Sequence, residues 1–253
     1  MKLWEVLEFK KEEMISLVGG GGKTTTMYAL AKDLKLLNKK VLVSTTTAIY
    51  LPEREQVQHM IISETEKNVD KRLRESAEKS KIVGLGRSIT KENKLKGISP
   101  KEMDEIYEKR YFDIILVEAD GAKHKSLKAP DTHEPVIPKK STIVIIVVGM
   151  DACGEKFSSN IVHRPEQIAE ITGIKYEEII TPDIITNIVI SDKGLLKGIP
   201  ENAKVFLLIN KVDTKERYTM AREIGIKVRE KDTSKIEKIL LCNMQKEQVV
   251  GIM

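Results

Sequence analysis

Cysteine and long apolar runs are scarce in this chain of 253 residues. Its two cysteines, Cys153 and Cys242, are too few and too far apart for a disulfide framework or a four-thiolate zinc site. The longest apolar run, residues 143–148, is much shorter than the roughly 18 residues that span a bilayer. The N-terminal segment carries scattered charges and lacks the apolar core and cleavage site of a signal peptide. We therefore expect a soluble, cytoplasmic protein that does not bind a membrane.

Aromatic residues and charge of one sign are also in short supply. Phe, Trp and Tyr make up 4% of the chain, and 43 Lys and Arg are nearly balanced by 38 Asp and Glu, which leaves a formal net charge of +5. A nucleic-acid-binding protein usually gathers its positive charge on one face, beside aromatic residues that stack on the bases. We therefore expect no nucleic-acid partner. The hydrophobic content of 41% is enough for a folded core.

Short apolar runs alternate with amphipathic helical patterns along most of the chain. Continuous apolar runs are typical of parallel strands covered on both faces, and apolar residues three and four apart predict helices. Strands are predicted at residues 14–18, 41–44, 82–85, 114–118, 143–148 and 205–209. Helices are predicted at residues 24–38, 64–79, 165–171, 183–190 and 215–224, the last ending at Gly225, and a capping box at Ser99 and Glu102 starts one more. Residues 87–97 are expected to be an exposed loop. This order predicts an α/β fold with a mostly parallel central sheet.

Four glycines, a lysine and two threonines lie between the first predicted strand and the first predicted helix. Glycines let the backbone approach a phosphate closely, and a helix N-terminus adds the positive end of its dipole. In this arrangement the lysine reaches the β- and γ-phosphates and the first threonine binds Mg²⁺. The usual motif begins with a glycine where this chain has Leu17, so we expect a loop that is tighter or differently bent. The predicted phosphate-binding residues are Gly19, Gly20, Gly21, Gly22, Lys23, Thr24 and Thr25.

These features predict a P-loop NTPase-like fold of three layers. Residues 1–253 are expected to form one nucleotide-binding domain. The most charged part of the chain, around residues 63–110, is expected to be a partly helical insertion in that domain.

One predicted strand ends in two carboxylates and a glycine, namely Glu118, Asp120 and Gly121. A carboxylate at this place in a nucleotide site holds Mg²⁺, usually through water. Side chains two positions apart on an extended chain point the same way, so either acid could take the metal while the other handles water or a second substrate. We favour Thr24 and Glu118 as the Mg²⁺ residues and Lys23 and Asp120 as the catalytic residues, with the Gly121 N–H sensing the γ-phosphate. The alternative is an exposed turn whose charges do no chemistry.

The segment Asn210-Lys211-Val212-Asp213 directly follows another predicted strand. An Asp beyond a strand end can accept two hydrogen bonds from guanine, from N1 and the 2-amino group, and adenine lacks this donor pair. We expect Asp213 to read the base, Asn210 to brace the loop and the stem of Lys211 to cover the ring, which favours GTP over ATP. The alternative is a polar turn in a protein that takes ATP.

Two further polar segments could face the γ-phosphate or a substrate. Thr45 and Thr46 follow a predicted strand, and hydroxyl groups at the carboxyl end of a strand face the ligand crevice in open α/β sheets. Lys123 begins a basic segment, residues 123–130, that could bind an anionic substrate. The alternatives are ordinary β-propensity for the threonines and a solvated loop for the basic segment. Arg164 is a further candidate for an anion contact.

With these motifs in place, the chain resembles the YqeC-like family over nearly its whole length. The resemblance implies an accessory or biosynthetic role for the selenium cofactor of molybdenum hydroxylases. The segments that carry it are residues 15–25 (ISLVGGGGKTT), 41–50 (VLVSTTTAIY), 115–130 (ILVEADGAKHKSLKAP), 133–138 (HEPVIP), 147–155 (VVGMDACGE), 162–168 (VHRPEQI) and 208–213 (LINKVD).

Two broader likenesses bear on the chemistry. The phosphate loop and Glu118-x-x-Gly121 are similar to the loop and acidic switch of GTPases that load nickel or cobalamin into metal centres. The run Gly22-Lys23-Thr24-Thr25-Thr26 also resembles Mur-type ATP-dependent ligases, which activate carboxylates as acyl phosphates. The chain shows no second or third domain of the ligase kind.

We therefore predict a Mg²⁺-dependent NTPase, using GTP in preference to ATP, that assists maturation or insertion of a selenium- or molybdenum-containing cofactor. Two alternatives stay open. One is an ATP-dependent kinase or ligase that acts on a small anionic cofactor precursor, and the other is a non-catalytic, nucleotide-gated binding module. The expected partners are the nucleotide and a molybdenum hydroxylase or a cofactor-assembly protein, and the resemblance also allows a homodimer.

Overall fold

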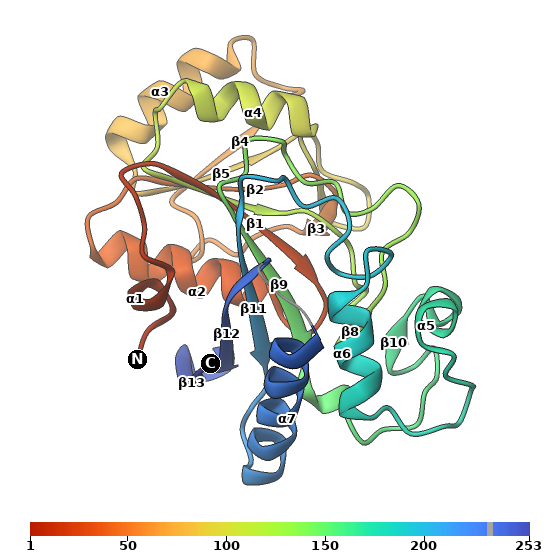
Figure 1. The fold of residues 1–253 in the computed structure, drawn as a ribbon. Coiled ribbons are helices and arrows are strands. Elements are labelled where there is room, and N and C mark those ends of the chain that lie inside the picture. Colours follow the sequence, from red (N-terminus) through yellow and green to blue (C-terminus); the bar gives the residue numbers. More distant parts are fainter. Residues whose placement is uncertain (232–234) are drawn as a thin grey trace.

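A large twisted sheet organises the chain (Figure 1). The computed structural model describes residues 1–231 and 235–253. Among these residues, nine strands form one sheet in the order β13-β12-β11-β9-β1-β7-β2-β5-β4. Its strands are β1 (Glu13–Gly19), β2 (Val41–Thr45), β4 (His59–Ile62), β5 (Ile82–Gly86), β7 (Ile114–Glu118), β9 (Ile143–Gly149), β11 (Lys204–Asn210), β12 (Ile236–Asn243) and β13 (Gln248–Ile252). Each pairing between the described strands of this sheet is parallel except that of β12 with β13.

The central strand β1 pairs with β7 on one side and with β9 on the other. All seven residues of β1 are buried, as expected for a strand covered on both faces. Because parallel strands end at the same edge, the loops that follow β1, β7, β9 and β11 meet there. This edge carries the glycine loop.

Helices cover both faces of the sheet. On one face lie α1 (Leu3–Leu7) and α2 (Lys23–Leu36), which pack on β1 through Ile15 and Leu17. The other face is covered by α3 (Val69–Lys79), α4 (Pro100–Glu108), α6 (Pro182–Ile190) and α7 (Lys215–Lys231), and α5 (Pro165–Thr172) packs against α6. Met14 and Val18 of β1 face that second layer. The predicted three-layer α/β fold with a mostly parallel sheet is confirmed.

Several short elements complete the fold. β3 (Ala48–Tyr50) pairs with β6 (Lys94–Lys96), and β8 (Leu127–Lys128) pairs with β10 (Val162–His163). The 3₁₀ turns η1 (Met150–Ala152) and η2 (Met244–Lys246) follow β9 and β12. The pairing of β8 with β10 brings a segment that follows the acidic strand end close to the start of α5.

Three local expectations are wrong. Residues 87–97 are not simply an exposed loop, because β6 pairs with β3 and Leu95 is 2% exposed. The helix predicted to end at Gly225 continues to Lys231, since the missing side chain of Gly225 leaves room for Met253, whose sulfur lies 2.6 Å from where a Cβ would stand. The helix predicted from residue 64 begins at Val69, where Asn68 caps it by accepting a hydrogen bond from the Lys71 amide. The capping box of Ser99 and Glu102 is confirmed.

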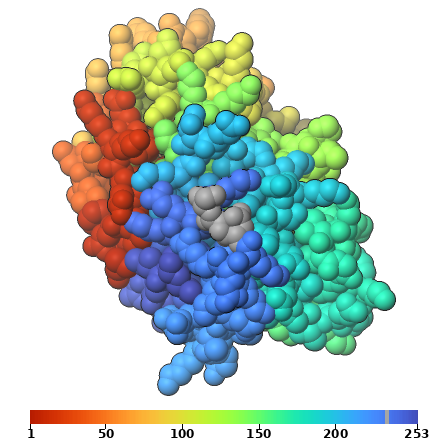
Figure 2. Space-filling view, in the orientation of Figure 1, coloured from red at the N-terminus to blue at the C-terminus, as the bar shows by residue number. Residues whose placement is uncertain are grey.

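The two ends of the chain lie side by side. The amide of Val249 donates to the carbonyl of Met1 at 2.9 Å, and Lys2 pairs with Glu247 at 2.9 Å. In the space-filling view the first residues, in red, adjoin the last strand, in blue (Figure 2). Of the helices in the described ranges, none combines the length and the apolar character needed to cross a membrane.

Candidate functional site

The glycine loop connects β1 to α2 at the middle of the sheet edge. Leu17, where the usual motif has its first glycine, lies within β1, so the loop is a short turn of residues 19–22. Gly19 has a φ of +97°, and a Cβ there would lie 2.2 Å from the carbonyl oxygen of Val147. Gly21 has a φ of +79°, and its Cβ would lie 2.3 Å from the amide nitrogen of Gly149. Any side chain at these two positions would clash with the neighbouring strand end.

The first three amides of the loop already have acceptors. The amide of Gly19 donates to Asp120 Oδ2, that of Gly20 to the carbonyl of Val147 and that of Gly21 to the carbonyl of Lys125, each at 2.9 Å. The first hydrogen bond of α2 runs from Thr26 to the carbonyl of Gly22. In the described part of the chain, the amides of residues 22–25 have no such acceptor. An anion would therefore meet these four N–H groups at the helix N-terminus.

Lys23 is buried against both predicted acids. Its Nζ lies 2.6 Å from the carbonyl oxygen of Gly19, 3.0 Å from Asp120 Oδ1 and 3.6 Å from Glu118 Oε1, and the residue is 4% exposed. Burial opposes its charge, but the carboxylates of Asp120 and Glu118 outweigh that effect, so the pKa of Lys23 lies above its ordinary value. The ammonium group thus lies between the glycine loop and the two carboxylates.

The residues predicted to bind Mg²⁺ touch one another. The hydroxyl of Thr24 donates to Glu118 Oε2 at 2.6 Å. Burial raises the pKa of Glu118. The positive charge of Lys23 and the hydrogen bond from Thr24 partly offset this rise. Asp120 Oδ1 is buried and accepts no hydrogen bond in proper geometry from the residues that the structure describes, although Lys23 Nζ lies 3.0 Å from it. A hydroxyl, a carboxylate and an unsatisfied carboxylate oxygen fit Mg²⁺, which proteins hold with few side chains and with substrate phosphates.

A row of alternating charges extends from Asp120 through Lys128 and Glu134 to Arg164, and the sequence analysis did not predict it. Asp120 Oδ2 lies 3.0 Å from Nζ of Lys128, whose side chain is 0% exposed. Lys128 also contacts Glu134, and Glu134 receives two hydrogen bonds from the Arg164 guanidinium. Although burial works the other way, the hydrogen bonds from Arg164 and Lys128 lower the pKa of Glu134 to about 2. The sequence contains one indication that Lys128 is buried, because this lysine lies between the apolar residues Leu127 and Ala129.

The other residues predicted on the γ-phosphate side are placed differently. The Thr45 hydroxyl donates to the carbonyl of Glu118 at 2.8 Å, and the Thr46 hydroxyl donates to the carbonyl of Val136 at 2.6 Å. These hydroxyls therefore fix the end of the acidic strand at Glu118 and the neighbouring segment at Val136. The carbonyl of Gly121 accepts a hydrogen bond from Lys128 at 2.7 Å. Lys123 is exposed, with a φ of +45°.

The predicted base-binding residues are divided between two environments. Asn210 is buried and braces the glycine loop, since its amide group donates to the carbonyl of Gly21 at 2.8 Å. Lys211 contacts Ser126 at 2.7 Å and Asp151 at 2.6 Å. Asp213 lies on an exposed turn and pairs with Arg217 at 2.7 Å. The structure brings Asn210 to the phosphate loop and leaves Asp213 at the surface.

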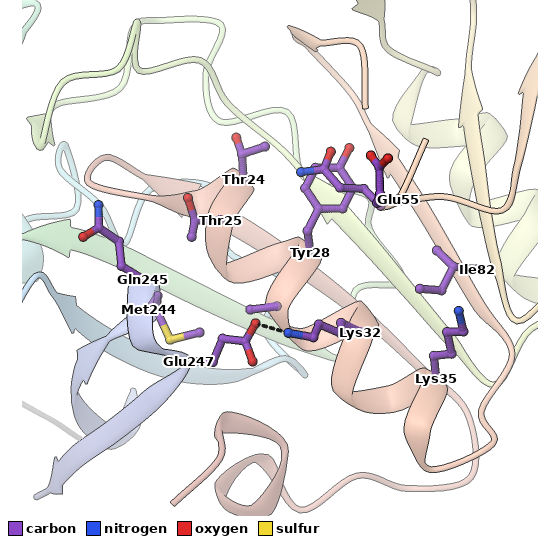
Figure 3. A pocket seen from close by; sticks show the side chains of 12 residues that line it. Thr24, Thr25, Tyr28, Lys32, Lys35, Glu55, Ile82, Met244, Gln245 and Glu247 are labelled. Carbon is purple, nitrogen blue, oxygen red and sulfur yellow. Dashed lines mark hydrogen bonds and ion pairs between the residues drawn. The ribbon is translucent and has the colours of Figure 1, made fainter. Parts of the chain in front are cut away.

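A cavity of about 590 Å³ lies along α2 beside the loop (Figure 3). Thr24, Thr25 and Tyr28 line it from the helix, Gln56 lines it from the turn before β4, and Gln245 lines it from η2. Tyr28 is 9% exposed, and its hydroxyl has no hydrogen-bond partner in the described residues. Burial raises the pKa of Tyr28, with a further contribution from Glu118, so the hydroxyl stays protonated and able to donate. Tyr28 was not singled out from the sequence, where it matches the apolar pattern of its helix.

Replacing Glu134 by Gln tests the row of charges. Because the pKa of Glu134 is lowered from 4.5 to about 2 on folding, its stabilisation is complete above about pH 5 and is lost as the pH falls towards 2. We expect Glu134→Gln to lower the free energy of unfolding by roughly 3 kcal/mol at pH 7 and the deficit to shrink below about pH 4.5. Urea unfolding at several pH values measures this. Glu170→Gln, which removes an exposed pair with Lys193, is the control and should change little. A deficit that does not vary with pH would contradict the assignment.

The comparisons with known proteins agree with the resemblance seen in the sequence. A family model described as "YqeC protein" matches residues 15–166. The YqeC protein of Escherichia coli (strain K12) is 30% identical over 244 residues, which cover 96% of this chain and 91% of that protein.

The matches among solved structures include two signal recognition particle receptors. FtsY from Mycoplasma mycoides matches with a TM-score of 0.39 at 13% identity, over 98% of this chain and 65% of that one. FtsY from Elizabethkingia anophelis matches with a TM-score of 0.40 at 17% identity, over 96% of this chain and 63% of that one. The chain thus spans slightly less than two thirds of these receptors. The family model and the Escherichia coli relative, in contrast, extend over most of the sequence, and on their strength the chain belongs to the YqeC family.

Proposed function

We propose that the chain is a Mg²⁺-dependent nucleoside triphosphatase that uses GTP in preference to ATP. One observation carries this proposal. The strand-to-helix junction after the glycine turn presents the amides of residues 22–25, which have no acceptor among the described residues, and the buried side chain of Lys23 faces Glu118 and Asp120. Amides and a lysine suit phosphate oxygens, and the two carboxylates suit a metal ion and a water molecule.

Binding a triphosphate would begin with an exchange of partners for Lys23. The ammonium group leaves the carbonyl of Gly19 and Asp120 and turns to the β- and γ-phosphates. Two buried carboxylates then lose a positive neighbour, which is costly in a region of low polarity. When Mg²⁺ is bound by Thr24 and Glu118, it supplies the missing positive charge and polarises the phosphate oxygens. Nucleotide and metal are therefore expected to bind together.

Asp120 is the proposed catalytic carboxylate. Its Oδ2 is fixed by the amide of Gly19 at 2.9 Å, whereas Oδ1 is released when Lys23 moves away. Oδ1 can then accept a hydrogen bond from water and orient it towards the γ-phosphorus. Attack by that water breaks the bond to the bridging oxygen and leaves a nucleoside diphosphate and inorganic phosphate. The Gly121 amide, which has no acceptor among the described residues, would sense the γ-phosphate.

The preference for GTP rests on Asp213. Its partner Arg217 is four residues away on the surface of α7, and an exposed pair of this kind contributes well under 1 kcal/mol. Guanine could therefore displace Arg217 at little cost. Asn210, three residues before Asp213, already connects this strand end to the glycine loop, which supports a base near Asp213 and phosphates at Lys23 as parts of one proposed site.

The proposed wider role is the one that the resemblance to the YqeC family implies. We propose that hydrolysis assists maturation or insertion of a selenium- or molybdenum-containing cofactor into a hydroxylase, with that enzyme or a cofactor-assembly protein as the partner. Lys123 and the rest of the exposed loop after Asp120 would meet the partner or its anionic cargo. Thr45 fixes the strand end before this loop through the carbonyl of Glu118, and Thr46 fixes Val136, whose amide donates to the carbonyl of Ala119.

Lys23→Ala tests the phosphate site. We expect Mg²⁺-GTP affinity to fall by at least 100-fold, about 2.7 kcal/mol, because the variant loses the cation that meets the phosphates. Calorimetric titration with GTP and a non-hydrolysable analogue measures this. Lys193→Ala, which removes an exposed lysine that pairs with Glu170 at 2.8 Å, is the matched control. If Lys23→Ala binds Mg²⁺-GTP with the native affinity, Lys23 does not bind the phosphates and the proposed phosphate site is wrong.

Asp213→Asn tests the choice of base. The native protein is expected to prefer GTP to ATP by tenfold or more, and the variant should lose most of that preference while keeping its ATP affinity, because only guanine uses the carboxylate. Competition titrations with both nucleotides give the ratio. A native protein that prefers ATP would show that residues 210–213 are an ordinary polar turn.

A second candidate function is a kinase or ligase that acts on a small anionic acceptor. The cavity along α2 favours it, because Tyr28 lines this space together with Thr24, and the buried Tyr28 hydroxyl has no hydrogen-bond partner among the described residues. The carbonyl oxygen of the Gln56 side chain is occupied by the Glu53 amide, which leaves its NH₂ group free to donate. Such donors suit a carboxylate or phosphate group. This candidate predicts negligible turnover until the acceptor is added.

Tyr28→Phe separates the two candidates. Because the hydroxyl has no partner, its removal should leave the free energy of unfolding unchanged or raise it by up to about 1 kcal/mol. If the cavity binds an acceptor, the variant should also lose acceptor-stimulated turnover, measured with a series of small carboxylic and phosphoric acids, while its nucleotide affinity stays the same. A clear loss of stability would show that the hydroxyl is satisfied within the folded protein.

A further inference from the structure

Lys128 is the most deeply buried charge near the site, and the proposed reaction does not use it. It lies in β8, and its side chain is 0% exposed. Its Nζ contacts three oxygens from two segments of the chain, namely Asp120 Oδ2 at 3.0 Å, the carbonyl of Gly121 at 2.7 Å and the carboxylate of Glu134. A lysine is buried in this way only when its partners offset the loss of water.

The partners of Lys128 are themselves held in place. Arg164 grips Glu134 with both terminal nitrogens and lies 3.5 Å from Asp131 through Nε. Arg164 directly follows β10, the strand that pairs with β8, so the backbone brings the two cations to the same carboxylate. Lys128 is therefore held by Glu134, which Arg164 fixes in turn, and its ammonium group contacts Asp120.

Asp120 has a different set of partners before and after a nucleotide binds. In this structure it lies between two lysines, with Lys23 at Oδ1 and Lys128 at Oδ2. A triphosphate would draw Lys23 away and leave Lys128 as the only lysine in contact with the carboxylate. Lys128 would then be required more in the nucleotide-bound state than in the free state.

We propose that Lys128 is a positioning residue of the phosphate site, which holds Asp120 against the Gly19 amide when a nucleotide takes Lys23. This inference rests on the proposed function, because it requires that a nucleotide binds at Lys23. Lys128 itself does not touch the nucleotide. It acts through Asp120, whose Oδ2 stays fixed while Oδ1 becomes free for water.

A double-mutant cycle on nucleotide affinity tests this inference. The four proteins are the native chain, Lys128→Met, Asp120→Asn and the double variant, each titrated with Mg²⁺ and a non-hydrolysable GTP analogue. We expect Lys128→Met to weaken binding by at least tenfold in the native background and by less than about threefold in the Asp120→Asn background. The asparagine carries no charge that needs a lysine, and its carbonyl can still accept the Gly19 hydrogen bond.

The cycle distinguishes positioning from a merely structural role. If Lys128 only supports the packing of β8, both backgrounds should lose the same affinity, and the inference is overturned. Lys128→Gln keeps a donor for the carbonyl of Gly121 without the charge and serves if Lys128→Met does not fold; it should show the same dependence on Asp120. Lys193→Met is the control and should bind normally. If the native chain binds no nucleotide, the proposed function fails, whereas native binding with an unaffected Lys128→Met variant overturns this inference alone.

Discussion

The buried ion pair between Lys23 and Asp120 is the interaction on which the site depends. Its two charged atoms lie 3.0 Å apart, and the side chains are 3% and 1% exposed. A buried charge is costly without a partner, so a ligand that removes Lys23 must bring compensating charge. Inorganic phosphate alone would bring only negative charge next to Glu118 and Asp120. A phosphate together with a divalent cation would satisfy the lysine and the carboxylates at once, so the proposed function requires that nucleotide and metal bind together.

The topology of the sheet places this pair at its centre. Lys23 follows β1 and Asp120 follows β7, and these two strands are neighbours in the sheet. On the other side of β1, the end of β9 supplies Val147, whose carbonyl accepts the hydrogen bond of Gly20. Asn210, at the end of β11, reaches across to the carbonyl of Gly21. The glycine turn is thus held by its neighbours in the absence of a ligand, so binding a ligand there would cost little further conformational entropy.

The sequence predicted the parts of this arrangement that depend on neighbours along the chain. The apolar runs at 114–118 and 143–148 appear as β7 and β9 with bounds that match within a residue, and the glycine turn lies between a strand and a helix as expected. What it did not predict depends on partners far away in sequence. Lys128 is buried because Glu134 and Arg164 come to it, and Leu95 is buried because β3 lies beside it. The strand β12 was missed because Glu237 and Lys238 interrupt its apolar pattern.

Hydrolysis and nucleotide-gated binding would begin with the same event in this molecule. Since three amides of the glycine turn are fixed, a nucleotide would change the charge around Asp120 more than the shape of the loop. That change acts first on Lys128 and then on Glu134 and Arg164, in segments that cover the acidic strand end. A partner that senses the nucleotide would therefore recognise the segments that carry these residues. The hydrolase and the binding module differ only in whether Asp120 Oδ1, once free of Lys23, holds a water molecule that can reach the γ-phosphorus.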